Sequence, residues 1–180
     1  MDFMQLAKER HSVRKYAPFE VEEEKILNIL EAGRVAPTAA NKQPQRFLVV
    51  SSNDGLTKLS KACNLHGAPL AILVCSMRDK AWRRPQDGHS MVDIDSTIAT
   101  THMMLQAWTD GIGSCWITWF DPEIIRQEFS LPEEVIPVNI LVLGYADEEK
   151  TEAQSPNRHE QKRIPLKDMV WREKLPCSLS

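Results

Sequence analysis

The stretch SMVDIDSTIATTHMMLQAWTDGIGSCWITW, residues 90–119, does most to decide the fold. Residues 90–109 are expected to form one long helix whose broad apolar side carries Ile94, Ile98, Met104, Leu105 and Trp108. Asp110-Gly111 is a typical helix end, and residues 114–119 then read as a short strand. A helix with so wide an apolar side is expected to be central or to face a second subunit.

Before this stretch, the sequence predicts two helices, a loop and two strands. The helices cover residues 2–9, with Asp2 as N-cap, and residues 22–33, with Gly33 helping to end the second. Residues 35–44 carry two prolines and no periodicity, which indicates a loop. Strands are expected at 47–51 and 70–76, buried on both faces, with a helix between them that carries Leu56, Leu59 and Cys63. These three elements would form a β-α-β unit.

After it, Asp121 and Pro122 are expected to start a helix over 122–129, and residues 138–145 to form the last strand. A polar linker, 147–161, precedes the segment 162–175, whose apolar residues are Ile164, Leu166, Met169, Val170 and Trp171. The pattern leaves open whether this segment packs on its own domain or on a partner subunit. The basic loop 78–89 is expected to be solvated rather than to cover a pocket.

Composition and charge favour a folded domain that binds neither nucleic acid nor membranes. The 180 residues fit one domain, with 42% hydrophobic and 26% charged residues and a net charge of −3. That charge gives no reason to hold a phosphate backbone or an anionic membrane. The N-terminus has no apolar signal segment, so we expect a cytoplasmic protein.

The cysteines and the histidines do not indicate a metal site. Cys63, Cys75, Cys115 and Cys177 form no Cys-x-x-Cys pair, so reduced and mostly buried thiols are expected. His89, Asp93 and Asp95 have a spacing that would suit a metal on a helix. At a helix start, however, such residues are more often caps and solvated charges, so no metal site is predicted.

Chemistry-bearing residues gather at the boundaries of the expected elements. Arg10, Ser12 and the pair Lys162-Arg163 offer cations and a hydroxyl for a phosphate. Asn41 and Gln43 offer amides for the polar edge of a heterocycle, in a loop stiffened by Pro37 and Pro44. The glycines at 111 and 113 would let the backbone approach a flat ligand, although a helix end before a core strand explains them equally well. Neither a Walker loop nor a G-x-G-x-x-G motif occurs.

The order of five motifs identifies a family resemblance. RHSVRKY (10–16), APTAANKQPQRF (36–47), DGIGSCWI (110–117), LVLGYADE (141–148) and KRIPLKDMVWRE (162–173) follow one another along the chain. Together they resemble the FMN-dependent nitroreductase family, over residues 3–171. The resemblance implies one domain over residues 1–180 with an α+β fold, in which helices flank a mixed central β-sheet. It also implies a homodimer with FMN at its interface and a C-terminal segment that extends over the partner.

The resemblance assigns site residues one by one. Arg10, His11, Ser12 and either Lys162 or Arg163 are expected at the FMN phosphate, and Arg14 at the N1/O2 edge of the ring. Pro37, Thr38, Ala39, Asn41 and Gln43 are expected to line the flavin from the other subunit. Trp116, Ile117 and Thr118 would lie against one ring face, with the Thr118 backbone N–H at N5. Arg14 and Thr118 are therefore the catalytic candidates.

The implied function is hydride transfer from NADH or NADPH through the flavin to a nitroaromatic, a quinone or a similar small acceptor, by a ping-pong mechanism. Alternatives are reductive dehalogenation, flavin cleavage, a flavin-binding dimer without turnover, or a structural protein that has lost FMN. Two departures bear on the acceptor. Thr118 and Trp119 stand where larger family members carry an acidic residue and a glycine, and Asn64 is not a lysine although some relatives place a second cation at this point of the ring edge.

Overall fold

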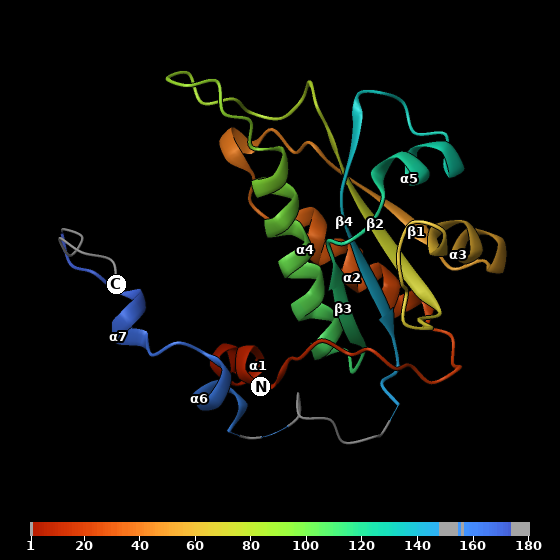
Figure 1. Ribbon diagram of the computed structural model, residues 1–180, viewed down its shortest axis with the longest axis horizontal. Helices are drawn as coiled ribbons and strands as arrows, with labels where there is room; N and C mark the ends of the chain where they lie inside the picture. The colour runs from red at the N-terminus through yellow and green to blue at the C-terminus, as the bar shows by residue number, and fades with distance from the viewer. Residues whose placement is uncertain (1, 148–154, 156, 174–180) are drawn as a thin grey trace. The chain divides into compact units, whose positions relative to one another are not determined.

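The computed structural model describes residues 2–147, 155 and 157–173, which divide into two units, Met1–Glu148 and Glu149–Ser180. In the first unit the helices and strands follow in the order α1 (Phe3–Glu9), α2 (Glu23–Val35), the short 3-10 helix η1 (Ala39–Asn41), β1 (Gln45–Val50), α3 (Asn53–Ser60), β2 (Leu70–Met77), α4 (Val92–Thr109), β3 (Gly113–Ile117), α5 (Pro122–Glu128) and β4 (Val135–Gly144) (Figure 1). The second unit contains α6 (Arg158–Lys162) and α7 (Leu166–Met169).

The sheet has the strand order β1-β2-β4-β3, and all three pairings are antiparallel. The α+β fold is therefore confirmed. Among the described residues, the parallel part of the expected mixed sheet is one isolated bridge between Ser12 and Ser114. The expectation that β1, α3 and β2 form a β-α-β unit with parallel strands is wrong, because β1 and β2 run antiparallel.

Both faces of the central strands are buried under helices (Figure 1). Even-numbered residues of β2, such as Ile72, pack in a core cluster with residues of α2 and α4. Odd-numbered residues, such as Leu73, pack in a second cluster with residues of α3 and α5. This follows from the alternation of side chains along a strand. Each fully buried Leu or Ile adds roughly 1.5–3 kcal/mol to the free energy of unfolding, so the two clusters hold the layers together.

Gly33 does not help to end α2, as its place in the sequence had suggested, but lies inside the helix and is buried. A Cβ at this position would lie 2.8 Å from Cγ of Met103 and 2.9 Å from Cζ of Phe47. The residue is therefore needed for the close approach of α2 to α4.

Three strands differ from the prediction made from the sequence: β1 in its burial, β4 in where it starts and β3 in where it ends. β1 is half exposed, with Leu48 and Val49 at 37% and 38% exposure, because it lies at the edge of the sheet. β4 starts before Pro137, whose missing N–H is tolerated where the register shifts beside Val74 and Cys75. β3 ends at Ile117, so Thr118 and Trp119 belong to the following turn.

Several local predictions are confirmed. The Asp2 side chain caps α1, and the Asp121 side chain caps α5, which has Pro122 in its first turn. In the basic loop 78–89, residues 78–80 and 83–89 are exposed, as expected for a solvated loop, whereas Ala81 is buried. Cys63, Cys75 and Cys115 are free thiols, the last two buried, while Cys177 lies outside the described residues.

The second unit is short, and its described apolar side chains are at least half exposed, namely Ile164, Leu166, Met169, Val170 and Trp171. Its helix α6 falls partly in the expected linker, which is therefore not wholly irregular. Residues 174 and 175 of the expected C-terminal segment lie outside the described residues. Within the described parts of the chain, no helix has the length and apolar character that crossing a membrane requires.

Candidate functional site

The segment 12–17 lies across the ends of β3 and β4 and brings three of the sequence motifs together. Its Val13 N–H donates to the Ser114 carbonyl at 2.9 Å, and its Ala17 N–H donates to the Tyr145 carbonyl at 2.8 Å. The Tyr16 hydroxyl donates to the Val13 carbonyl at 2.8 Å and fixes the turn of the segment. RHSVRKY is thereby placed against DGIGSCWI and LVLGYADE.

Two glycines make this docking possible. A Cβ on Gly113 would lie 2.7 Å from Cγ2 of Val13 and 3.2 Å from the Gly144 carbonyl oxygen. A Cβ on Gly144 would lie 2.7 Å from Cδ of Pro69 and 3.0 Å from Cδ1 of Tyr16. Hydrogen atoms suffice at both positions, whereas a methyl group would push the N-terminal segment off the sheet.

Arg10, Ser12 and Arg14 converge on the start of β3. Burial raises the pKa of the Cys115 thiol, and the charge of Arg14, a hydrogen bond from Ser12 and the charge of Arg10 each act in the opposite direction. Three groups of the predicted phosphate and ring-edge set therefore act on one thiol, and Ser12 is held beside it by its bridge to Ser114. Such a cluster of cations and a hydroxyl favours an anion or an electron-rich ring edge.

His11 belongs to the same region but packs rather than points outward. Its ring meets the Trp108 ring edge-on, with the centroids 4.8 Å apart. Its Nδ1 lies 3.2 Å from the Glu9 carbonyl oxygen. These contacts fasten the N-terminal segment to the C-terminal end of α4.

The three predicted ring-face residues at the end of β3 differ in what they expose. Trp116 and Ile117 point to opposite faces of the sheet, and Ile117 is only 8% exposed. Thr118, the next residue, is exposed. A ligand bound at this segment would therefore be contacted mainly by its backbone and by residues that follow the strand.

The loop with Pro37, Thr38, Ala39, Asn41 and Gln43 is held in an unusual conformation. Ala40, Asn41 and Gln43 have φ values of 49°, 52° and 51°, a left-handed region that costs non-glycine residues energy. The Thr38 hydroxyl accepts a bond from the Gln43 N–H at 3.1 Å. The Ala39 N–H donates to Oδ1 of Asp95 at 2.9 Å, which ties the loop to the first turns of α4.

The structure therefore brings together only part of the predicted site. Arg10, His11, Ser12 and Arg14 adjoin the C-terminal end of α4, whereas the loop 37–43 is tied to its N-terminal end. Asp95 and Trp108 are separated along the helix by about 20 Å, at 1.5 Å per residue. Lys162 and Arg163 lie in the second unit.

Asp95 was expected to be a solvated charge, and that expectation is wrong. The residue is fully buried, and its second oxygen, Oδ2, has no hydrogen-bond partner among the described residues. Asp93, two residues earlier, is exposed, as expected. The signal that would have identified Asp95 is its place four residues before Ala99 in the row Ala99, Met103 and Ala107, which is buried along α4.

His66 is a second residue that the sequence did not single out. Partial burial lowers the pKa of its imidazole, and the positive charge of Arg14 acts in the same direction, so the two side chains are near one another. The backbone of His66 is left-handed, with φ 56°, and its N–H donates to Oδ1 of Asn64 at 2.8 Å. An Asn-x-His-Gly turn between a helix and a buried strand is its sequence signal.

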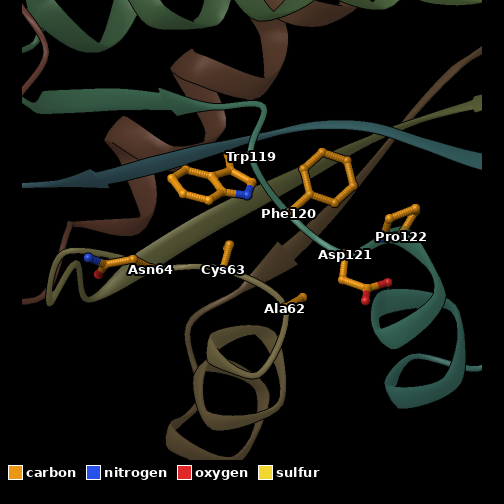
Figure 2. A pocket seen from close by; sticks show the side chains of 7 residues that line it. All are labelled: Ala62, Cys63, Asn64, Trp119, Phe120, Asp121 and Pro122. Carbon is orange, nitrogen blue, oxygen red and sulfur yellow. The ribbon is translucent and has the colours of Figure 1, made fainter.

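Two cavities adjoin these residues. One, of about 630 Å³, lies between the end of α3 and the turn after β3 and is lined by Ala62, Cys63, Asn64, Trp119, Phe120, Asp121 and Pro122 (Figure 2). The other, of about 450 Å³, lies along α2 and β1 and is lined by Leu27, Leu30, Glu31, Arg34, Gln43, Gln45, Arg46 and Phe47. The side of the loop that carries Gln43 thus opens onto the second cavity.

Comparison with known proteins agrees with this architecture. The family model described as "Nitroreductase family" matches residues 7–64 and 56–145. A crystal structure of a nitroreductase family protein from Clostridium difficile 630 is 50% identical, with a TM-score of 0.93, and the match covers 97% of this chain and 100% of that one.

Two further relatives have more specific names. A protein of Archaeoglobus fulgidus, described provisionally as an NADH dehydrogenase/NAD(P)H nitroreductase, is 33% identical over 86% of this chain and 91% of its own length. A structure described as an FMN-dependent nitroreductase from Clostridium difficile R20291 is 30% identical, with a TM-score of 0.75, over 91% of this chain and 98% of that one.

Proposed function

The chain belongs to the nitroreductase family, and on that premise we propose that it is an FMN-dependent oxidoreductase that passes hydride from NADH or NADPH to a small organic acceptor. The observation that carries the proposal is the convergence of Arg10, Ser12 and Arg14 beside β3. The relatives named as NAD(P)H nitroreductases and as an FMN-dependent enzyme support it.

The residues present fit FMN. Arg10 and Ser12 offer a cation and a hydroxyl for a phosphate, and we propose that His11 lies beside the phosphate through its backbone and that Lys162 or Arg163 completes this set. When bound, FMN supplies the capacity to accept hydride at N5 and to release it again.

Arg14 and Thr118 are the residues that we propose to act on the ring. Arg14 is exposed, and none of the described residues forms an ion pair with it, so its charge is available to the N1/O2 edge. A fixed cation there stabilises negative charge on that edge without any rearrangement of the protein. The Thr118 backbone N–H orients the ring through N5.

The thiols near the proposed site are not suited to nucleophilic catalysis. Burial raises the pKa of Cys63 to about 11 and raises the pKa of Cys115, so both are neutral thiols near pH 7. The proposed chemistry needs no side-chain nucleophile, because orientation and charge are what the protein supplies.

We further propose that the site is shared between two copies of the chain. The loop 37–43 and the arginine cluster lie about 20 Å apart along α4, too far for one compact ring site within a copy. Two α4 helices packed antiparallel about a two-fold axis would bring the loop of one copy to the arginines of the other. Pro37, Thr38, Ala39, Asn41 and Gln43 would then line the flavin from the partner.

A surface for such packing exists on α4. Ile94, Ile98, Thr101, Leu105 and Trp108 recur every three or four residues along its length and are exposed or half-buried. A stripe with this spacing suits helix-helix packing. The exposed apolar residues of segment 162–173 suit contact with the partner as well, and we propose that the chain is one domain whose C-terminal segment crosses to it.

The proposal has a direct spectroscopic test. We expect the purified protein to be a yellow dimer whose flavin absorbance bleaches under anaerobic conditions on addition of NADH or NADPH and returns on addition of a quinone. Parallel lines in double-reciprocal plots would support the ping-pong order. A colourless monomer that takes up no FMN, or a flavin that neither nicotinamide bleaches, would overturn the proposal.

The three described free thiols suit a reducing compartment, and we propose that the protein is cytoplasmic.

A further inference from the structure

A group of buried polar side chains between α4 and the sheet is not used by the proposed hydride transfer. The group consists of Gln45, Ser76, Asp95, Ser96 and Asn139, each at most 8% exposed. One side-chain atom of each has no hydrogen-bond partner among the described residues, namely Oε1 of Gln45, Oγ of Ser76, Oδ2 of Asp95, Oγ of Ser96 and Nδ2 of Asn139. Folded proteins leave few buried polar atoms unpartnered, so this group requires a further partner.

Three of the five side chains belong to one face of the sheet. Gln45 of β1 lies opposite Ser76 of β2, and Asn139 of β4 lies opposite Val74, two residues from Ser76. Opposite residues of antiparallel strands share a face, and so do residues two apart along a strand. Val74 packs in the core cluster that includes Met103 of α4, so the three polar side chains are on the face that α4 covers.

The other two side chains come from α4, which contacts β1, β2 and β4. The Thr100 hydroxyl is 3.0 Å from Oδ1 of Asn139, which places this part of α4 over the polar face of the sheet. Ser96 lies about one turn before Thr100, and Asp95 is next to it. The bond from the Ala39 N–H to Oδ1 of Asp95 brings the loop before β1 to the same turns of α4. The unpartnered atoms of helix and sheet therefore face one another.

The amide of Asn139 is expected to turn its oxygen toward this group. The Thr100 hydroxyl has one proton but two neighbouring oxygens, the Ser96 carbonyl at 2.8 Å and Oδ1 of Asn139 at 3.0 Å. The carbonyl can only accept, whereas an amide can present either its oxygen or its NH₂ group. Both contacts become hydrogen bonds if the Asn139 amide donates to Thr100. Its oxygen then takes the place of Nδ2, and all five unpartnered atoms are oxygens.

Asp95 adds one negative charge to these oxygens. None of the ion pairs among the described residues includes it, and the donor to its carboxylate is the neutral Ala39 N–H. A buried carboxylate is strongly disfavoured unless a cation balances it. Water would satisfy the hydrogen-bonding groups but would leave the charge in place. A divalent cation would leave one positive charge buried, whereas a monovalent cation balances Asp95.

We propose that the five oxygens bind a monovalent metal cation, sodium or potassium, between the first half of α4 and the sheet. Oxygen atoms are the ligands that hard cations prefer. The site is different from the spacing of His89, Asp93 and Asp95 in the sequence, because Asp93 is exposed. The bound cation balances the carboxylate that anchors loop 37–43. A consequence that rests on the proposed function is tighter FMN binding in the presence of the cation.

Thermal unfolding of the purified protein, followed by circular dichroism, tests the site without any nicotinamide. The midpoint is measured in NaCl, in KCl and in choline chloride at equal ionic strength, because choline is too large for a buried site. At ten times the half-saturating concentration of the preferred ion, the unfolding equilibrium constant is expected to fall about elevenfold. The midpoint then rises by about 3–6 °C over that in choline chloride, and the rise saturates.

Two variants locate the effect. Asp95→Asn keeps the shape of the side chain but removes the charge, and it is expected to abolish the rise. Ser96→Ala removes one oxygen and is expected to reduce the rise by at least about half, although in choline chloride it should be no less stable than the natural protein, because it removes a buried hydroxyl without a partner. Asp93→Asn is the matched control, since Asp93 is exposed on the same part of α4, and it is expected to keep the full rise.

The proposal is overturned if the natural protein has the same midpoint in all three salts, since water or a proton would then satisfy the group. It is also overturned if Asp95→Asn keeps the rise that Asp93→Asn shows, since the ions would then act elsewhere. Where Asp95→Asn does not fold, an unreduced rise in Ser96→Ala overturns it. None of these results depends on flavin reduction, so a flavin that neither nicotinamide bleaches would overturn the proposed function and leave the cation site standing.

Discussion

Replacing Asp95 by alanine is expected to weaken FMN binding by more than an order of magnitude, although Asp95 is itself fully buried. Its Oδ1 accepts the Ala39 N–H at 2.9 Å, and this bond holds a loop with three left-handed non-glycine residues. A hydrogen bond to a charged group contributes roughly 1.5–3 kcal/mol. Loss of about 2 kcal/mol from the ordered loop corresponds to a rise in Kd of about thirtyfold.

The Kd for FMN can be measured by titrating the apoprotein and following the quenching of flavin fluorescence. Asp95→Asn is expected to lie between the natural protein and Asp95→Ala, since its amide oxygen still accepts from Ala39 but carries no charge. Asp93→Ala is the matched control, because Asp93 lies in the same part of α4 but is exposed. It removes a similar favourable charge near the helix N-terminus and leaves the loop bond in place.

The reasoning is refuted if Asp95→Ala, folded by circular dichroism, binds FMN as tightly as Asp93→Ala does. The loop would then keep its conformation without its bond to α4, and Asp95 would be no more than a buried polar residue.

Three further predictions concern the arginine cluster and the cavity. Gly113→Ala should lower both the midpoint of urea unfolding and FMN affinity, because its Cβ would lie 2.7 Å from Cγ2 of Val13, and overpacking of this kind costs about 1–3 kcal/mol; unchanged values would contradict the proposed docking. Cys63, with its pKa raised to about 11, should react with iodoacetamide at pH 8 at least about a hundredfold more slowly than an ordinary cysteine and should speed up toward pH 11, as peptide mass spectrometry can show; fast labelling at pH 8 would be the opposite result. The NMR titration midpoint of His66 should lie below that of an ordinary histidine side chain because of burial and the Arg14 charge, and it should rise in Arg14→Ala, which removes only the second cause; an unchanged midpoint would show that the Arg14 charge does not act on His66.

Most of the fold was predictable from the sequence because its signals are local. The periodicity of α4, the Asp121-Pro122 start of α5 and the apolar run of β2 each depend on a few adjacent residues, and all three elements are present. Strand direction was not predictable in this way. Nothing within β1 or β2 says whether they pair parallel or antiparallel, because pairing depends on residues distant in the sequence.

The site shows the same division. The motifs with Arg10, Ser12 and Arg14 and with Gly113 were recognised from residue types and order, and the structure brings them together. The role of Asp95 was missed because the loop that it holds is 56 residues away along the chain. Gly33 was assigned to a helix end because a glycine's packing partner is invisible in the sequence.

The central claim is that one flavin site is built from two copies of the chain, and mixed dimers test it most directly. Arg14→Ala and Asn41→Ala each damage both sites of a homodimer. A dimer of one chain of each kind has one doubly damaged site and one intact site if Arg14 and the 37–43 loop come from different copies. Purified mixed dimers, made by co-expression with two tags, are therefore predicted to bind one FMN per dimer with natural affinity. Mixed dimers with no site of natural affinity would contradict the account, because every site would then draw both groups from a single copy.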